Sequence, residues 1–403
     1  MTPNPQRPSS NDPLGLYLHI PFCTAKCGYC DFNSYAGHDH AIPNYAKTLL
    51  KDAALWREAV RDRPVETVFF GGGTPSLTPV HDMAEIVGGL RATFRIAPAA
   101  EISLEANPGS LTTEYLRGLH DIGFNRLSIG VQSFDDEELF SLDRIHTGAQ
   151  AKDAYASARD AGFENVNLDL IYGLSEQPLS SWQQNLEQAL ALNPEHLSLY
   201  ALTVEEGTPL ARDIARGRTQ APDPDLQAEH YEWTQERMAR VGYEHYEISN
   251  WARPGRRCRH NLVYWQHREY LGLGAGAHSY LDGTRFGMVL LPNRYGELVN
   301  ESAEAADGRM RHIATAESIA PETAMADALI LGLRLIDGVD VRDFARRYGA
   351  SPDDVYGEVL REFEGYAILE RTPTHLRLTK RGLLLSNELF QRLLPEPVEA
   401  GRS

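Results

Sequence analysis

The sequence lacks the features of an exported or membrane-embedded protein. No apolar run approaches the ~18 residues that can span a bilayer. The start, Met1-Thr2-Pro3-Asn4-Pro5, has no basic segment followed by an apolar core. We therefore expect a cytoplasmic protein with no secretory signal and no integral membrane segment.

Basic residues are also in short supply. The chain holds 39 Lys and Arg against 56 Asp and Glu, which gives a formal net charge of −17. Such a chain repels phosphate backbones, so nucleic acid is not expected as a partner. With 403 residues, the chain is long enough for a barrel-sized domain and one or two smaller ones.

Cysteine is scarce, and its placement is informative. Of the four cysteines, three form a C-x₃-C-x₂-C motif at Cys23, Cys27 and Cys30, which excludes a disulfide framework. Thiolates are soft ligands that suit iron–sulfur clusters. A [4Fe–4S] cubane needs four ligands and the motif supplies three, so we expect the open iron to be chelated by S-adenosylmethionine. One electron from the cluster can then split the sulfonium carbon–sulfur bond.

A structural zinc site is the alternative interpretation of these thiols, with His19, His38 or His40 as the fourth ligand. Zinc modules usually combine two C-x₂-C pairs. This chain has no second pair, because its remaining cysteine is the distant Cys258. The spacing therefore favours the cluster.

Short apolar runs alternate with stretches of helical spacing in the first half of the chain. The runs predict strands at Leu14–His19, Val65–Phe70, Glu101–Ala106, Arg126–Val131, Asn165–Ile171 and His196–Ala201. The stretches between them predict helices at Tyr45–Val60, Met83–Phe94, Glu114–Ile122, Ala151–Ala161 and Trp182–Leu192. Six βα units in succession predict an α/β fold, a partial (β/α)₆ barrel, with a flat doubly wound sheet as the alternative.

The pattern divides the chain into five parts. We expect a tail over 1–13, the barrel over 14–243, a segment covering the barrel over 244–320, a winged-helix-like domain over 321–390 and a tail over 391–403. The winged helix is indicated by helices at Glu322–Ile336, Val341–Tyr348 and Pro352–Glu364, then strands at Ala367–Arg371 and Leu376–Thr379. Acidic residues outnumber basic ones there, so we expect packing or docking of a partner rather than DNA binding.

Glycines and polar residues fall at the carboxyl ends of the predicted strands. They are Gly71–Pro75, Glu105, Gln132, Asp169 and Ala201. In parallel barrels this rim carries the function. Glycines let a ligand approach the backbone closely, and carboxylates can bind an ammonium group or ribose hydroxyls. A βα turn or a structurally paired carboxylate is the ordinary alternative for each residue taken singly.

Several motifs resemble a known family. Tyr17–Cys23, the cysteine motif, Gly71–Pro75, Glu105, Gly130–Gln132 and Asp169–Gly173 resemble radical S-adenosylmethionine proteins of the oxygen-independent coproporphyrinogen III oxidase group. The oxidase branch has a further cysteine two residues after the third cluster ligand, where this chain has Phe32, and a longer N-terminal arm. The resemblance therefore argues against coproporphyrinogen III dehydrogenase activity. The HemW branch, implicated as haem chaperones, has phenylalanine there and an H-N-x-x-Y-W motif, present here as His260–Trp265.

The resemblance implies roles for single residues. Cys23, Cys27 and Cys30 would hold the cluster, and S-adenosylmethionine would be lined by Tyr17, Tyr29, Gly72, Gly73, Thr74, Glu105, Gln132, Arg144, Asp169 and Ala201. Candidate haem residues are His260, Asn261, Tyr264 and Trp265, because haem needs an axial donor and aromatic walls. The neighbouring Arg256, Arg257 and Arg259 could pair with propionates, and Cys258 is expected to be inert. Alternatively, His260 and Trp265 only pack the C-terminal part against the barrel.

Together, these features predict a haem chaperone with a [4Fe–4S] cluster and S-adenosylmethionine. Its expected partners are haem, haem-acceptor proteins and an electron donor. Two alternatives remain: a radical enzyme acting on a porphyrinogen or another small molecule, and a regulator acting through the winged helix. The acidic balance of the chain disfavours the regulator.

Overall fold

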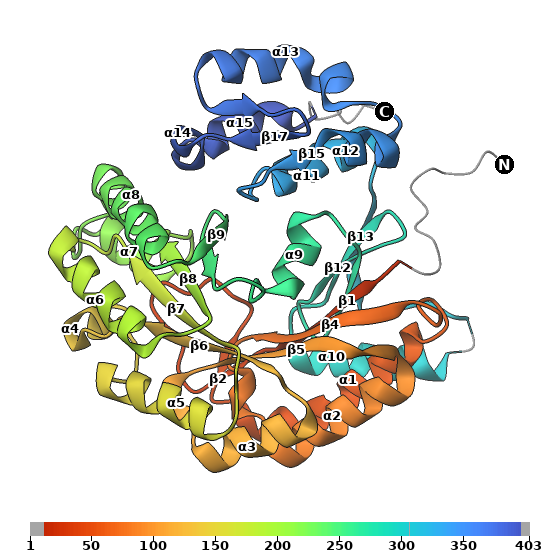
Figure 1. The fold of residues 1–403 in the computed structure, drawn as a ribbon. Coiled ribbons are helices and arrows are strands. Elements are labelled where there is room, and N and C mark those ends of the chain that lie inside the picture. The colour runs from red at the N-terminus through yellow and green to blue at the C-terminus, as the bar shows by residue number, and fades with distance from the viewer. Residues whose placement is uncertain (1–11, 306, 396–403) are drawn as a thin grey trace.

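Six parallel strands form the centre of the structure, a computed structural model that describes residues 12–305 and 307–395 (Figure 1). They are β1 (Leu14–Ile20), β4 (Pro64–Gly72), β5 (Arg95–Ala106), β6 (Arg126–Gln132), β7 (Val166–Tyr172) and β8 (His196–Ala201). These strands lie side by side in the order of the chain. A doubly wound sheet would reverse its strand order near the middle. The partial barrel is therefore confirmed and the flat sheet is excluded.

Helices between these strands cover the outer face of the sheet (Figure 1). They are α1 (Ile42–Trp56), α2 (Val80–Thr93), α3 (Thr113–Ile122), α5 (Gly148–Asp160) and α6 (Leu179–Leu192), all close to the predicted positions. Three further helices, α4 (Asp136–Ser141), α7 (Pro209–Ala215) and α8 (Pro224–Arg240), were not predicted. Among them α4 buries one residue and α7 buries none, so their sequences carry little apolar periodicity.

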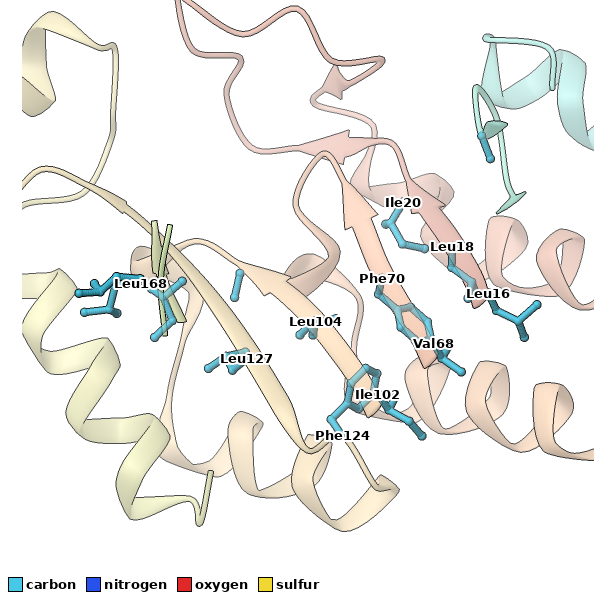
Figure 2. Close-up of a cluster of buried hydrophobic side chains, with 14 of the residues drawn as sticks. Leu16, Leu18, Ile20, Val68, Phe70, Ile102, Leu104, Phe124, Leu127 and Leu168 are labelled. Atoms are coloured by element: carbon cyan, nitrogen blue, oxygen red, sulfur yellow. The ribbon is translucent and has the colours of Figure 1, made fainter. Parts of the chain in front are cut away.

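The hydrophobic core lies between the sheet and these helices, because side chains alternate along a strand. Figure 2 shows the buried side chains of three adjacent strands: Leu16, Leu18 and Ile20 of β1, Val68 and Phe70 of β4, and Ile102 and Leu104 of β5. The residues between them, such as Tyr17 and His19, point to the opposite, inner face. The same alternation therefore builds the core and aims a second set of side chains into the barrel.

The segment after the barrel extends the sheet at both ends. At one end, β10 (Asn250–Ala252) pairs antiparallel with β8, and β9 (Glu244–Glu247) pairs with β10. At the other, β11 (Tyr270–Leu273) pairs parallel with β1 and is followed by β12 (His278–Leu281), β13 (Thr284–Met288) and β14 (Ile313–Ser318). Two helices, α9 (Arg259–Trp265) and α10 (Pro292–Glu304), also belong to this segment. The segment therefore does more than cover the barrel, the role expected from the sequence, because it adds strands to both ends of the central sheet.

The C-terminal part has the layout expected of a winged helix. Helix α11 (Pro321–Gly332) is followed by β15 (Val339–Asp340), by helices α12 (Val341–Tyr348) and α13 (Pro352–Gly365), and by strands β16 (Leu369–Arg371) and β17 (His375–Leu378). The three strands form a small sheet in the order β15, β17, β16. Two helices follow, α14 (Lys380–Leu384) and α15 (Ser386–Leu393). Because α15 continues past residue 390 and buries Leu393, the C-terminal tail begins later than predicted. Residues 1–11 and 396–403 of the two predicted tails lie outside the described residues.

No helix in the described parts of the chain combines the length and the apolar character that crossing a membrane would require.

Candidate functional site

The three thiols of the cysteine motif line one cavity of about 380 Å³ at the carboxyl ends of the parallel strands. Cys23 ends β2 (Phe22–Cys23), a short strand directly after β1, and is buried. Cys27 and Cys30 lie in the following loop and are half-buried. The Cys30 amide donates to the Cys27 carbonyl at 3.2 Å, which closes a turn between them. The local fold thus brings three unpaired thiols to a single opening.

Hydrogen-bond donors surround these thiols. Thr74 Oγ1 donates to Cys23 Sγ at 3.5 Å, and Arg144 Nη1 donates to Cys27 Sγ at 3.4 Å. Such contacts stabilise anionic sulfur ligands. Arg144 is held by Asn107 Oδ1 and the Gly130 carbonyl, at 2.7 and 2.8 Å from its Nη2, while its buried Nε has no partner among the described residues. A buried donor without a partner leaves a place for an acceptor of a bound group. The thiols and their donors therefore fit an iron–sulfur cluster.

The geometry is less suited to a single zinc ion. Nowhere in the described residues do three or more His, Cys, Asp or Glu side chains lie close enough to hold one metal ion. The candidate fourth ligand His19 is engaged elsewhere, with Nδ1 3.0 Å from Tyr17 Oη and Nε2 2.8 Å from the Asn33 carbonyl. In a [4Fe–4S] cluster each of the three thiolates binds a different iron, so the three sulfur atoms need not lie around one metal ion. The zinc alternative is therefore disfavoured.

Close contacts explain the glycines after β4. Gly72 has a φ of +113°, and a Cβ there would lie 2.6 Å from the His19 ring. A Cβ at Gly73 would lie 2.6 Å from the Phe22 carbonyl oxygen and 3.0 Å from Cys23 Sγ. Both glycines line the cavity. A side chain at Gly73 would therefore press on the first thiol, and its absence lets a ligand approach the backbone.

Two carboxylates lie in the wall of the same cavity. Glu105 Oε2 accepts a hydrogen bond from Gly72 N at 3.2 Å, and burial together with the charge of Asp169 raises the pKa of Glu105 to about 7. Asp169 accepts hydrogen bonds from Ser128 Oγ at 3.1 Å and Asn167 Nδ2 at 2.8 Å, and burial raises its pKa as well. A ligand that brings an ammonium group and hydroxyls would compensate this desolvated pair.

Most residues that the resemblance assigned to S-adenosylmethionine line this cavity. They are Tyr29, Gly72, Gly73, Thr74, Glu105, Gln132, Arg144, Asp169 and Ala201. Tyr17 does not line it, because its ring stacks on Phe69 and lies over His260 in the barrel interior. The structure adds Ser128, Tyr200, Leu202, Thr203 and Glu205 to the lining. Ser128 and Tyr200 follow the inward alternation of β6 and β8, so the period of two could have identified them.

Helix α9 carries the H-N-x-x-Y-W motif and begins at a carboxylate. Glu101 of β5 accepts hydrogen bonds from Arg259 N at 3.2 Å and His260 N at 3.1 Å. The buried His260 ring uses both nitrogens, with Nδ1 2.8 Å from Thr67 Oγ1 and Nε2 2.8 Å from Tyr264 Oη. Burial lowers the pKa of His260 to about 3. In this arrangement His260 offers no free nitrogen to haem iron, which fits the alternative packing role.

The other residues of the proposed haem region are spread over several surroundings. Asn261 is half-buried on α9, and the Trp265 ring lies 4.5 Å from the guanidinium of Arg334. Arg259 pairs with Glu66 and Arg257 with Glu244, at 3.5 and 3.3 Å. Burial raises the pKa of the Cys258 thiol to about 12, as expected for an inert side chain. The sequence motif therefore does not fold into one compact haem pocket.

Three thiols at the mouth of a partial (β/α)₆ barrel define a protein of the radical S-adenosylmethionine class. The chain matches the Radical SAM superfamily over residues 17–189 and the HemN C-terminal domain over residues 319–385. The solved structure of the coproporphyrinogen III oxidase HemN from Escherichia coli, a radical SAM enzyme, superposes with a TM-score of 0.82 at 23% identity, covering 95% of this chain and 90% of that one. This likeness shows a shared fold.

Curated relatives identify the family within that class. A Mycobacterium tuberculosis protein named heme chaperone HemW is 37% identical over 390 residues, which are 96% of each chain. The heme chaperone HemW of Escherichia coli is 35% identical over 393 residues, which are 95% of this chain and 99% of that one. The chain belongs to the HemW family.

Proposed function

We propose that this protein is a haem chaperone that binds haem and passes it to acceptor proteins. In this proposal Cys23, Cys27 and Cys30 hold a [4Fe–4S] cluster, S-adenosylmethionine binds beside it, and an electron donor serves the cluster. The observation that carries the proposal is the likeness over almost the whole chain to relatives named heme chaperones. The cytoplasmic location expected from the sequence remains a prediction.

The lining of the cavity offers candidate partners for the ammonium, ribose and carboxylate groups of S-adenosylmethionine. Glu105 would accept hydrogen bonds from the ammonium group, Asp169 would bind ribose hydroxyls, and the unpaired Nε of Arg144 would donate to the carboxylate. When bound, a reduced cluster supplies one electron to a chelated sulfonium. Thr74 and Arg144 would hold the thiolates in place through the sulfur contacts described above.

Phe32 favours a chaperone over oxidation of a porphyrinogen. Its side chain lines the mouth of the cavity and is 62% exposed. The oxidase branch of the resembled group has a cysteine at this position. A phenyl ring neither gives nor accepts a proton, so it cannot replace a thiol in acid–base chemistry at the mouth. An exposed aromatic ring beside the cofactors is, however, compatible with contact to a partner.

The proposal is tested on the anaerobically reconstituted chain by three measurements. We expect a Soret shift on haem titration, transfer of that haem to an apo-haemoprotein, and no protoporphyrinogen from coproporphyrinogen III in the presence of S-adenosylmethionine and reductant. Absence of any Soret shift would refute the chaperone. Conversion of coproporphyrinogen would establish the alternative enzyme instead.

A matched pair of cysteine variants tests the cluster assignment within the same experiment. Cys27→Ser removes a thiol that lines the cavity, whereas Cys258→Ser changes a buried thiol at the N-cap of α9, outside that cavity. We expect the brown chromophore and the iron content to fall in Cys27→Ser alone. Equal loss in both variants would contradict the assignment.

A further inference from the structure

Glu138 of α4 is a carboxylate that accepts hydrogen bonds from four side chains. Its Oε1 accepts from Gln177 Nε2 at 2.8 Å and from Ser181 Oγ at 2.7 Å. Its Oε2 accepts from Ser133 Oγ at 2.6 Å and from Asn185 Nδ2 at 2.7 Å. A carboxylate has room for about four donors, so both oxygens are fully used by the protein itself. Glu138 therefore does not bind a ligand, and its role has to lie in what it holds together.

The four donors come from three different parts of the barrel. Ser133 lies in the turn directly after β6, Gln177 lies in the loop after β7, and Ser181 and Asn185 lie on α6. Gln177 in turn accepts a hydrogen bond from Gly173 N at 2.8 Å, which shapes the start of its loop. Ser133, Gln177 and Asn185 are buried, and buried donors are costly to leave without an acceptor. The carboxylate of Glu138 therefore ties α4 to the carboxyl ends of two neighbouring strands.

Helix α4 has little else to fix its position. It has six residues and buries only Leu139. A helix this short is not stable alone. Its first residue, Asp136, accepts a hydrogen bond from Gly148 N at 2.8 Å, which holds the start of the helix. The last turn of α4 therefore depends on the hydrogen bonds of Glu138.

The last turn of α4 leads directly to Arg144. Leu142 N donates to the Glu138 carbonyl at 3.1 Å, and Arg144 N donates to the Leu139 carbonyl at 2.9 Å. Asp143, between them, has a φ of +54°, a left-handed conformation that surrounding contacts have to maintain. The backbone of Arg144 is thus built on α4, and a shift of the helix moves the arginine.

The guanidinium of Arg144 requires an accurate position. It contacts Cys27 Sγ at 3.4 Å, Asn107 Oδ1 at 2.7 Å and the Gly130 carbonyl at 2.8 Å, and its buried Nε has no partner in the described part of the chain. The five donors of an arginine form a rigid fork, so they move together. A displacement of about 1 Å is enough to break hydrogen bonds of these lengths.

We propose that Glu138 is a positioning residue for the S-adenosylmethionine site. Through α4, it places Arg144 against Cys27 and against the carboxylate of the bound ligand. This inference rests on the proposed function, in which Arg144 binds that carboxylate. Glu138 does not line the cysteine cavity, so its effect on the ligand and on the cluster passes through Arg144.

A double-variant cycle on the full, reconstituted chain tests this role. It compares wild type, Glu138→Ala, Arg144→Ala and the variant that carries both changes. Glu137→Ala is the matched control, because Glu137 is the preceding residue of the same helix, is exposed and makes no side-chain hydrogen bond or ion pair among the described residues. Equilibrium dialysis measures the affinity for S-adenosylmethionine, and electron paramagnetic resonance measures the reduced cluster without it.

Circular dichroism and cluster absorbance check that each variant is folded. If Glu138→Ala does not fold, Glu138→Gln takes its place, because glutamine keeps the size of the side chain and loses one accepting oxygen.

We expect the Kd for S-adenosylmethionine to rise roughly tenfold in Glu138→Ala and to stay unchanged in Glu137→Ala. In the Arg144→Ala background, the change at Glu138 should alter Kd by less than about twofold, because the two residues act as one unit. The resonance signal of the reduced cluster should shift in Glu138→Ala in the same direction as in Arg144→Ala, since both variants lose the donor to Cys27 Sγ.

Two results would overturn the positioning role while S-adenosylmethionine binding by wild type stands. One is an unchanged affinity in Glu138→Ala. The other is a loss of affinity that is just as large in the Arg144→Ala background, because Glu138 would then act independently of the arginine. If wild type binds no S-adenosylmethionine, the proposed cofactor site itself fails and this inference fails with it.

Discussion

Glu105 has a clear electrostatic environment at the residue scale. It lies beside Asp169 in a desolvated wall, and within the described part of the chain only the Gly72 amide donates a hydrogen bond to its carboxylate. Since both effects disfavour a negative charge, the pKa of Glu105 is raised to about 7, well above its ordinary value of 4.5. The group therefore changes its protonation state near neutral pH unless a cation binds to it.

This predicts that binding of S-adenosylmethionine depends on pH through Glu105. The ionised carboxylate pairs with an ammonium group, and its fraction rises roughly tenfold between pH 6 and pH 8 for a pKa near 7. Wild-type affinity should increase over this range by about that factor. Glu105→Gln should bind weakly with a flatter profile, and the difference between the two proteins removes the titration of the ligand itself. Equal pH profiles in equilibrium dialysis would contradict the role of Glu105.

His260 shows the opposite response to burial. It is a base whose pKa falls from 6.5 to about 3, so the folded protein holds it neutral while the unfolded chain protonates it below pH 6.5. Its contribution to stability is therefore present above pH 6.5 and is lost as pH falls toward 3.

A variant without the imidazole should resist acid better. Between pH 7 and pH 5, wild type should lose roughly 2 kcal/mol more unfolding free energy than His260→Gln, because only wild type must keep a histidine neutral. Urea unfolding at the two pH values measures this difference. Parallel losses in both proteins would show that His260 is not held as a buried neutral base.

At the element scale, α9 depends on a residue from another element. The helix has seven residues, and its N-terminal amides at Arg259 and His260 reach Glu101 of β5. A helix this short is not stable alone. Its C-terminal end is held in turn by Arg347 of α12, which donates to the Gln266 and His267 carbonyls. Contacts from both domains therefore fix its position.

Removing the capping carboxylate should destabilise the protein strongly. Glu101→Ala leaves two amides of α9 without an acceptor and removes a negative charge beside the buried Arg126, so we expect a loss of roughly 2–4 kcal/mol in unfolding free energy. Glu66→Ala is the control, since Glu66 pairs with Arg259 at 3.5 Å on the surface and should change stability by less than about 0.5 kcal/mol. Similar losses in the two variants would contradict the capping role.

The sequence predicted elements well where apolar alternation marks them. Five of the six central strands begin and end close to the predicted residues, but β5 begins at Arg95 rather than Glu101. Residues 95–99 contain Pro98 and are exposed or half-buried, so they carry no burial pattern. Pairing of β11 with β1 was also missed, because a four-residue strand finding a distant partner leaves no local signal.

Part of the candidate site could also be predicted from the sequence, because the order of the strands places their carboxyl ends together. Residues at strand ends could be placed on one rim, since parallel strands end at the same edge, and most of them do line the cysteine cavity. The face of α9 could not be assigned, because His260 and Trp265 are five positions apart and point in directions roughly 140° apart around the helix. The motif therefore suggested one pocket, whereas Trp265 lines a cavity beside the C-terminal domain and His260 is packed against Thr67 inside the barrel.

At the scale of the whole molecule, the fold separates two cavities. The cysteine cavity lies at the rim of the barrel, and a second cavity, of about 1060 Å³, lies where the C-terminal domain meets the end of α9. Tyr17 and His260 stack in the barrel interior and line neither cavity, whereas Trp265 of the same helix as His260 lines the second one.

The central claim is that three thiols hold an iron cube with one corner open. Mössbauer spectroscopy of the reconstituted chain, with and without S-adenosylmethionine, tests it most directly. We predict the spectrum of a [4Fe–4S] cluster in which one iron of the four acquires new parameters when S-adenosylmethionine is added. A four-iron spectrum that S-adenosylmethionine leaves unchanged, or a protein that retains zinc and assembles no cluster, would contradict the claim.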